Sequence, residues 1–289
     1  MVRHFYTEEE IDGFYQKWCK QSSADPSIKA AREKKLYKVP TSISISENST
    51  LTIAGIPIAS FSYAKKTHFN RLKIKYGEIF PQSTEELKYY QDLVILAFIS
   101  ENIPQGSRLL EIGGGHSRIL NFFKNNYECW NLDKYEGIGN GPRDKPESDH
   151  LGYTWVDGYI GEFHKDLQDN YFDFVFSISV LEHVPWDDEK IFNDIIADCN
   201  RVLRPGAYSM HLIDMVMPGW RHPIIEHIFN IQPMLTELIA FSEIIADKDL
   251  YFMSKKEYER TWVHTTNKSY EEFGQPSSYN LIWRKNRKV

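Results

Sequence analysis

The spacing of hydrophobic residues changes at about residue 108. From there to about residue 215, short apolar runs alternate with segments in which apolar residues recur every three or four positions. Such runs are typical of buried strands, and the recurring pattern is typical of amphipathic helices, so the alternation predicts a doubly wound α/β protein. Helices are expected over residues 83–101 and 188–203, the second with Asp187 as its N-cap. The predicted strands are residues 108–112, 127–132, 153–156, 172–178, 207–213 and 279–283.

The first 82 residues follow other patterns. A capping box at residues 7–10 predicts an early helix, and alternating apolar residues over residues 41–61 predict a hairpin. We therefore expect residues 1–82 to form a helical and hairpin extension that caps the functional site. Residues 83–289 would form the main domain, with a helical insertion near residues 218–260.

Composition and charge narrow the functional classes. The 289-residue chain has a formal net charge of −6, which argues against a nucleic-acid partner. The longest apolar run, residues 93–99, is too short to cross a membrane, and the acidic start of the chain does not resemble a signal peptide. Three widely spaced cysteines without a CxxC pair favour reduced thiols. We expect a cytoplasmic protein that binds neither nucleic acid nor membrane.

The candidate chemistry begins where the strand at residues 108–112 ends. Glu111 lies near its end, and Gly113, Gly114 and Gly115 follow before an amphipathic run begins. Glycines in such a strand-turn-helix allow a ligand to approach the backbone where any Cβ would collide. About twenty residues further on, Asp133 closes the next apolar segment, where a carboxylate can hold the hydroxyl pair of a ribose. The pattern predicts a nucleoside-containing cofactor.

A nicotinamide dinucleotide fits this turn poorly. Glu111 and Asp133 would repel the pyrophosphate of a dinucleotide, whereas they suit a cationic ligand rich in hydroxyl groups. The Gly-x-Gly-x-x-Gly fingerprint also fails, because Arg118 stands at its last position.

Further segments follow the turn in a fixed order. After Asp133 come Val156-Asp157-Gly158, then FDFVFSISVLEHVP at residues 172–185, then NRVLRPG at residues 200–206. With the glycine turn, this series resembles the class I S-adenosylmethionine-dependent methyltransferases, in the methyltransferase type 11-like branch that carries a VLEHV segment. The resemblance covers roughly residues 85–215.

The resemblance implies a Rossmann-like, doubly wound, mostly parallel seven-stranded sheet and S-adenosyl-L-methionine as cofactor. The chain departs from the family pattern at two places. Ser117 stands where the family often has a third glycine, and Ala207 replaces the second glycine of a PGG turn. Neither departure removes a side chain expected to bind the cofactor.

The resemblance also assigns roles. Glu111 and the glycine backbone would hold the methionine portion, Asp133 the ribose hydroxyls and Asp157 the adenine amino group, while the segment from Ser177 to Ser179 would pass beneath the sulfonium. The expected cofactor-binding residues are Glu111, Gly113, Gly114, Gly115, Asp133, Val156, Asp157, Gly158, Ser177 and Ser179.

Two histidines are candidate catalytic residues. His183 could remove a proton from an attacking hydroxyl, because an imidazole titrates near neutral pH, or it could serve a structural role beside Glu182. His211 ends the fifth predicted strand, where side chains face the ligand crevice of such sheets, or it could be a buried polar residue. Some related enzymes hold a metal with Glu-x-x-Glu-His, but Ser179 replaces the first glutamate, and we expect no metal.

The expected activity is methyl transfer to an oxygen of a small molecule or of a sugar or glycan precursor. The segment typical of exocyclic amine methylation, Asn/Asp-Pro-Pro-Tyr/Phe, is absent, and residues 177–180 read Ser-Ile-Ser-Val in its place. The alternative is a protein that binds S-adenosylmethionine without transferring its methyl group, as a sensor or scaffold. The sequence identifies neither the acceptor nor the oligomeric state, although a homodimer is one option.

Overall fold

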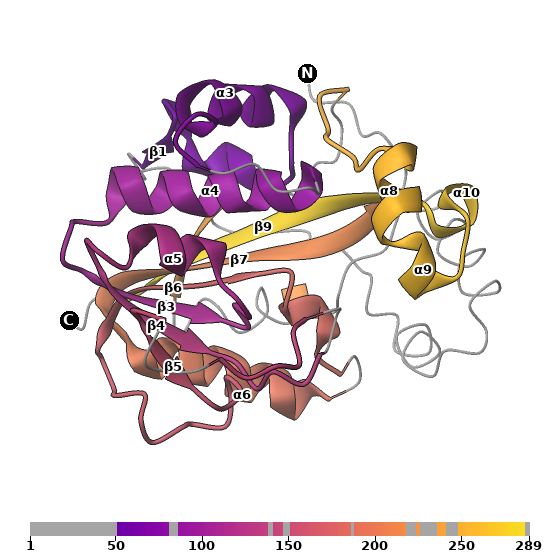
Figure 1. Cartoon of the computed structure of the whole chain (residues 1–289). Coiled ribbons are helices and arrows are strands. Elements are labelled where there is room, and N and C mark those ends of the chain that lie inside the picture. The colour runs from indigo at the N-terminus through magenta and orange to yellow at the C-terminus, as the bar shows by residue number, and fades with distance from the viewer. Residues whose placement is uncertain are drawn as a thin grey trace.

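A computed structural model gives the structure of residues 51–80, 86–137, 141–146, 151–185, 188–217, 224–225, 236–240 and 248–286. At its centre, five strands run parallel, and a sixth pairs antiparallel with one of these five and with a seventh strand. The doubly wound, mostly parallel seven-stranded sheet is thus confirmed (Figure 1). The strand order is β5 (Thr154–Val156), β4 (Glu128–Leu132), β3 (Arg108–Ile112), β6 (Phe172–Ile178), β7 (Leu203–Met217), β9 (Gln275–Lys285) and β8 (Thr236–Ala240).

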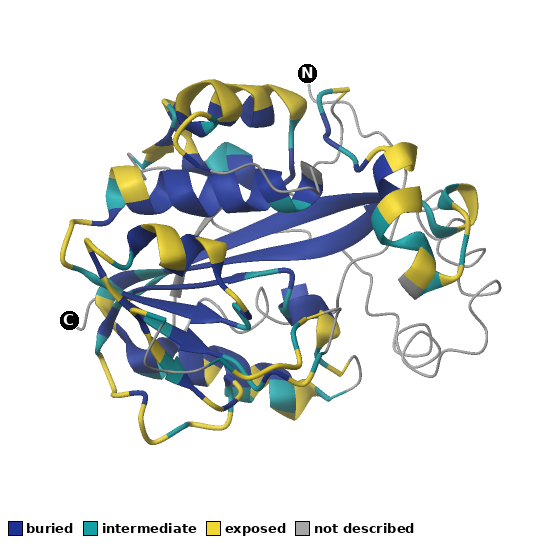
Figure 2. Cartoon of the chain, in the orientation of Figure 1, coloured by how far each residue is buried: buried dark blue, intermediate teal, exposed yellow. Residues whose placement is uncertain are grey.

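Helices cover both faces of this sheet. α4 (Glu86–Asn102) and α5 (Arg118–Phe123) lie on one face, and α6 (Glu189–Val202) lies on the other (Figure 1). Successive residues of β6 point to opposite faces, so Phe174 packs with the α4 layer and Val175 with the α6 layer. Figure 2 shows that β7, β9 and most of α4 are buried, and these elements form a rigid base for the strand ends.

The described part of the N-terminal extension packs beside α4. Its two-stranded hairpin turns at Ala54 and Gly55, which both have positive φ as a tight hairpin turn requires. The cap was expected over residues 1–82. None of its described residues, 51–80, lines the cavity described below, and residues 1–50 lie outside the described residues. The elements are β1 (Thr52–Ile53), β2 (Ile56–Pro57), η1 (Ile58–Phe61) and α3 (Lys66–Tyr76).

Several element boundaries differ from the expected ones. The strand expected over residues 207–213 is longer in the structure, where β7 spans residues 203–217. Its antiparallel pairing with β9 from Tyr208 to Met217 extends it beyond the predicted end. Asp188, and not Asp187, caps α6: its side chain accepts from the N–H groups of Lys190 and Ile191 at 3.0 and 3.2 Å.

The C-terminal part contains strand as well as helix. β8 lies within the stretch near residues 218–260 for which helices were expected, so the prediction is wrong at residues 236–240. Between β8 and β9, the described residues form three short helices, α8 (Lys255–Thr261), α9 (Val263–Thr266) and α10 (Tyr270–Phe273). Among the described helices, none has the length and apolar character needed to cross a membrane.

Candidate cofactor and acceptor site

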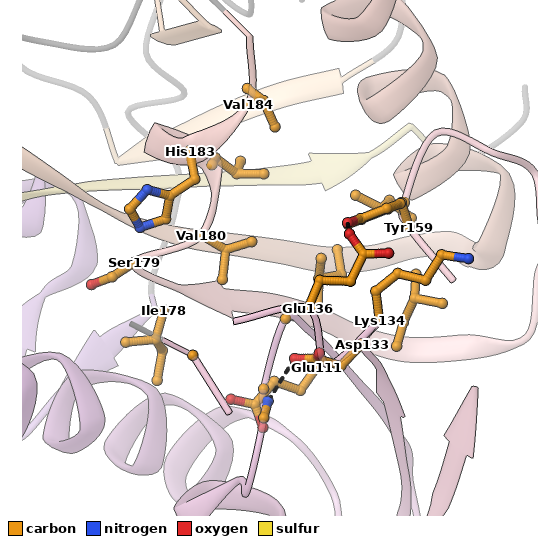
Figure 3. A pocket seen from close by; sticks show the side chains of 18 of the residues that line it. Glu111, Asp133, Lys134, Glu136, Tyr159, Ile178, Ser179, Val180, His183 and Val184 are labelled. Carbon is orange, nitrogen blue, oxygen red and sulfur yellow. Dashed lines mark hydrogen bonds between the residues drawn. The ribbon is translucent and has the colours of Figure 1, made fainter. Parts of the chain in front are cut away.

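A cavity of about 910 Å³ opens at the carboxyl ends of β3, β4 and β6. Its wall comes from the loops that follow these strands and β5, and from residues of α4, α5 and α6. Figure 3 shows His183 and Ser179 at one side of this pocket, Lys134 and Tyr159 at the other, and Glu111 with Asp133 between them. Ligands of doubly wound sheets bind in this position, outside the carboxyl ends of the strands.

The three glycines after β3 form a turn with no room for side chains. Gly113 and Gly115 have φ values of +66° and +51°, which glycine adopts without strain. A Cβ on Gly114 would lie 2.7 Å from the carboxyl carbon of Glu111 and 2.8 Å from Oδ1 of Asn131. The turn therefore presents bare backbone to the cavity, as the sequence predicted.

Asn131 holds this turn, a role that the sequence analysis missed. Its Oδ1 accepts from the Gly114 N–H at 3.1 Å, and its Nδ2 donates to the Gly115 carbonyl at 2.9 Å. Asn131 is fully buried on β4 and is the register partner of Glu111. A polar residue inside the apolar run of a buried strand was the signal in the sequence, because a buried amide requires partners.

Glu111 is a buried carboxyl group in the wall of the cavity. The Ser117 hydroxyl donates to it, and the same hydroxyl caps α5 by accepting from the Leu120 N–H at 2.8 Å. Burial raises the pKa of Glu111 to about 8; the nearby carboxylates of Asp92 and Asp133 act in the same direction, against Ser117 and Arg118. A cationic ligand group beside Glu111 would favour the charged carboxylate. Ser117, in place of a third glycine, thus contributes to the site.

An ion pair closes one edge of the cavity. Arg118 and Asp92 both line it, and their Nη2 and Oδ2 atoms lie 2.6 Å apart. The sequence analysis treated Arg118 only as the residue that breaks a dinucleotide fingerprint, and it missed Asp92. A single acidic residue in the otherwise apolar middle of α4 was the available signal.

Asp133 lies beside the glycine turn. Its two carboxylate oxygens accept from the N–H groups of Gly115 at 2.8 Å and Tyr135 at 2.6 Å. Gly158 also lines the cavity, and Val156 is buried at the end of β5. The Asp133 carboxylate thus takes part in holding the turn as well as facing the cavity.

Asp157 lies outside the cavity lining. Its side chain is 42% exposed, and its Oδ2 accepts from Lys145 Nζ at 2.6 Å. The hydrogen bond with Lys145 is the largest influence on the pKa of Asp157, which is lowered. The residue that closes this edge is instead Tyr159, whose hydroxyl donates to Glu136 at 2.6 Å. The adenine role expected for Asp157 is not visible in this arrangement.

His211 is fully buried and is absent from the cavity lining. Its Nδ1 and Nε2 lie 2.8 Å from the hydroxyl oxygens of Ser177 and Ser209, and its ring stacks on Trp283. Burial lowers the pKa of His211 to about 3. Both ring nitrogens are occupied away from the cavity, so the structure contradicts a role as base. Ser177, also fully buried, holds this histidine and does not line the cavity.

His183 and Ser179 do reach the cavity. Ser179 follows β6 with φ of +51°, and its hydroxyl lies 3.0 Å from Gln91 Oε1 and 2.9 Å from Asp214 Oδ1. The short helix η4 (Leu181–His183) then brings His183 into the wall, with 38% of its side chain exposed. Burial and the Lys88 ammonium lower the pKa of His183, and the Asp214 carboxylate opposes them. The imidazole is therefore neutral at pH 7 and able to accept a proton.

Among the described residues, no group of His, Cys, Asp and Glu side chains is arranged to hold a metal.

Residues 110–210, from β3 into β7, match the family model described as "Methyltransferase domain". The match covers about a third of the chain and includes the glycine turn, Asp133 and His183. The chain therefore carries a class I S-adenosylmethionine-dependent methyltransferase domain, and S-adenosylmethionine is the cofactor of that domain. No curated protein matches the chain.

Solved structures give distant likenesses to methyltransferases. Phosphoethanolamine N-methyltransferase 2 of Haemonchus contortus, in complex with S-adenosyl-L-methionine, is 16% identical with a TM-score of 0.43, over 77% of this chain and 57% of that one. A TehB-like methyltransferase of Corynebacterium glutamicum is 13% identical with a TM-score of 0.40, over 77% and 99%. This chain thus spans less than three fifths of the Haemonchus enzyme. Likeness at this level says nothing about the acceptor.

Proposed function

We propose that this chain transfers the methyl group of S-adenosylmethionine to a hydroxyl oxygen of a small molecule or sugar precursor, with His183 as the base. The observation that carries the proposal is the position of a neutral imidazole in the wall of the cavity whose other side holds the glycine turn and Asp133. When bound, S-adenosylmethionine supplies an electrophilic methyl group.

The residues present fit this cofactor. The Glu111 carboxyl group, buried near the carboxylates of Asp92 and Asp133, suits the ammonium of the methionine portion. Each carboxylate oxygen of Asp133 accepts one backbone N–H and keeps further lone pairs for ribose hydroxyls. The glycine turn allows the cofactor to approach the backbone closely.

Methyl transfer to a hydroxyl group requires a base, and His183 is suited to that role. A hydroxyl group is a weak nucleophile until its proton is removed, and a positioned neutral imidazole can remove it. Holding the hydroxyl in line with the methyl group supplies much of the remaining acceleration. A neutral amine would attack without such a base, so the histidine favours an oxygen acceptor. The Ser-Ile-Ser-Val segment at residues 177–180 supports the same choice, because enzymes that methylate exocyclic amines typically carry a different motif there.

The size of the cavity supports a small acceptor. Pockets for one ligand usually measure about 300–1,000 Å³. At about 910 Å³, the cavity is near the upper end of this range, so it has room for the cofactor and a compact acceptor together.

Turnover tests the proposal. The purified chain is incubated with methyl-labelled S-adenosylmethionine and a metabolite extract, and labelled products are separated. We expect a labelled small molecule, and we expect His183→Ala to lower its rate of formation by about 10²–10⁴-fold. His264→Ala, an exposed histidine on α9, serves as the control and should leave the rate unchanged.

Two results would count against the proposal. Binding of the labelled cofactor without transfer to any compound would favour the sensor or scaffold function instead. Transfer at the same rate by the His183→Ala protein would remove the histidine from the mechanism while leaving methyl transfer itself in place.

A further inference from the structure

Glu182 is a buried carboxyl group whose role the proposed function does not explain. Only 7% of the residue is exposed, and neither side-chain oxygen has a hydrogen-bond partner among the described residues. A buried carboxyl group without partners costs several kcal/mol if it is charged, so each such group calls for a physical reason. Glu182 immediately precedes His183 in η4.

Asp214 is a carboxyl group of this region that has hydrogen-bond donors. Its Oδ1 accepts from Gln91 Nε2 at 2.8 Å and lies 2.9 Å from the Ser179 hydroxyl. No described residue donates a hydrogen bond to the Glu182 side-chain oxygens. Its burial and the Asp214 carboxylate that faces it raise the pKa of Glu182 well above its usual range, against the Lys88 ammonium. Of the two carboxyl groups, Glu182 therefore holds the proton.

The three side chains lie near one another. His183 stands in the cavity wall, Glu182 Oε1 lies 3.9 Å from His183 Nε2, and the Asp214 side chain on β7 acts on both Glu182 and His183. The separation of 3.9 Å is longer than a hydrogen bond, and a small rotation of either side chain would close it. Among the described residues, the charged groups that act on His183 are Asp214 from β7 and Lys88 from α4.

We propose that Glu182, in its protonated form, is a positioning residue that bridges His183 to the Asp214 anion. Its carbonyl oxygen accepts from the His183 Nε2–H, and its O–H donates to Asp214. The bridge fixes the ring so that the unprotonated Nδ1 faces the acceptor. The inference rests on the proposed function, in which His183 is the base.

The proton balance is simple. As the acceptor oxygen bonds to the methyl carbon, His183 Nδ1 takes the hydroxyl proton and the imidazole becomes a cation. Glu182 keeps its proton throughout, and the new positive charge is stabilised by the Asp214 anion through the bridge. A neutral hydrogen-bonding side chain of the same shape should therefore serve as well as glutamic acid, whereas an apolar one should not.

The ionisation of His183 tests this directly and requires no acceptor. The imidazole signal is followed by nuclear magnetic resonance as a function of pH in the full chain saturated with S-adenosylhomocysteine, and it is assigned by its absence in His183→Ala. We expect Glu182→Gln to leave the pKa of His183 near the wild-type value, because the amide also accepts and donates. We expect Glu182→Leu to lower the pKa of His183 by about one unit, because the imidazolium loses its partner.

Two results overturn the inference. An equal fall in the two variants would show that Glu182 acts as an anion, and no fall in Glu182→Leu would show that it does not act on the ring. If Glu182→Leu fails to fold or to bind S-adenosylhomocysteine, Asp214→Asn provides the test: the pKa of His183 should fall there as well, and an unchanged value overturns the bridge. Because these titrations involve no turnover, their failure is separate from a failure of methyl transfer.

Discussion

The two ends of the cavity are built in different ways. At the end where we propose that the cofactor binds, the cofactor end, the glycine turn presents bare backbone, and the side chains that fix it, Asn131 and Asp133, lie two positions apart at the tip of β4. At the end where we propose that the acceptor binds, the acceptor end, side chains from α4, η4, β7 and the end of β6 meet, among them Gln91, Ser179 and Asp214. The first end depends on a local strand-turn-helix, and the second depends on the packing of elements far apart in the sequence.

This difference separates binding from chemistry. At the cofactor end, hydrogen bonds from side chains to the backbone hold the glycine turn in one conformation. Changes there should therefore alter affinity for the cofactor. The acceptor end contains the neutral His183 and a buried carboxyl group, so changes there should alter ionisation and rate. Affinity for S-adenosylhomocysteine, measured by calorimetry, is the quantity that distinguishes the two ends.

The largest effect is expected from a side chain in the turn. Gly114→Ala places a Cβ 2.7 Å from the Glu111 carboxyl carbon and 2.8 Å from Asn131 Oδ1, so either the turn or its supports must shift. Overpacking of this kind costs about 1–3 kcal/mol, and we expect affinity for S-adenosylhomocysteine to fall on the order of 100-fold.

A glycine away from the cavity controls for the change of residue type. Gly106 also has positive φ, but a Cβ there meets no atom within 4 Å. Gly106→Ala should lower the melting temperature somewhat and leave the affinity unchanged. Equal affinity of the Gly114→Ala and wild-type proteins would show that the cofactor does not use this turn.

The second-largest effect on affinity is expected from the two aspartates that were predicted to bind the cofactor. Asp133→Ala should weaken S-adenosylhomocysteine binding by about 1.5–3 kcal/mol, because charge-assisted hydrogen bonds to the ribose hydroxyls are lost. Asp157→Ala should have a smaller effect, because Asp157 is 42% exposed, outside the cavity lining and paired with Lys145. A larger loss from Asp157→Ala would reverse this order and restore its adenine role.

The fold could be predicted from the sequence, and so could most of the residues that lie at the cofactor end. Strands β3 and β6 begin and end at the predicted residues, because each is a short apolar run bounded by polar residues. Glu111 and Asp133 were found because each follows or ends such a run. Asn131 was missed because it contacts the turn across two strands, and that contact depends on the register of β3 with β4.

The acceptor end was predicted less well for the same reason. Nothing in the sequence near His211 shows that Ser177 and Ser209 occupy both ring nitrogens, since the first contact joins neighbouring strands. Gln91 and Asp214 likewise lie far apart in the chain and meet only when α4 packs over β7. Hydrophobic spacing predicts the elements, and it carries no information about which polar side chains meet between them.

The most gradual effect is a pH dependence that belongs to the cofactor end alone. With a pKa of about 8, Glu111 is mostly protonated in the free protein at pH 6–7. An ammonium group beside it favours the ionised form, so binding below pH 8 releases a proton. Affinity for S-adenosylhomocysteine should therefore rise with pH between 6 and 8, by up to about tenfold per unit, and level off above 8.

Glu111→Gln isolates this group from the other titrating residues. The variant should bind more weakly and lose the rise in affinity between pH 6 and 8, whereas Glu182→Gln at the acceptor end should keep it. A wild-type affinity that is flat over this range would mean that Glu111 stays protonated in the complex. In that case Glu111 would contact the cofactor as a neutral acid. Another group would then have to bind the ammonium for the glycine-turn end to remain the cation-binding end of the cavity.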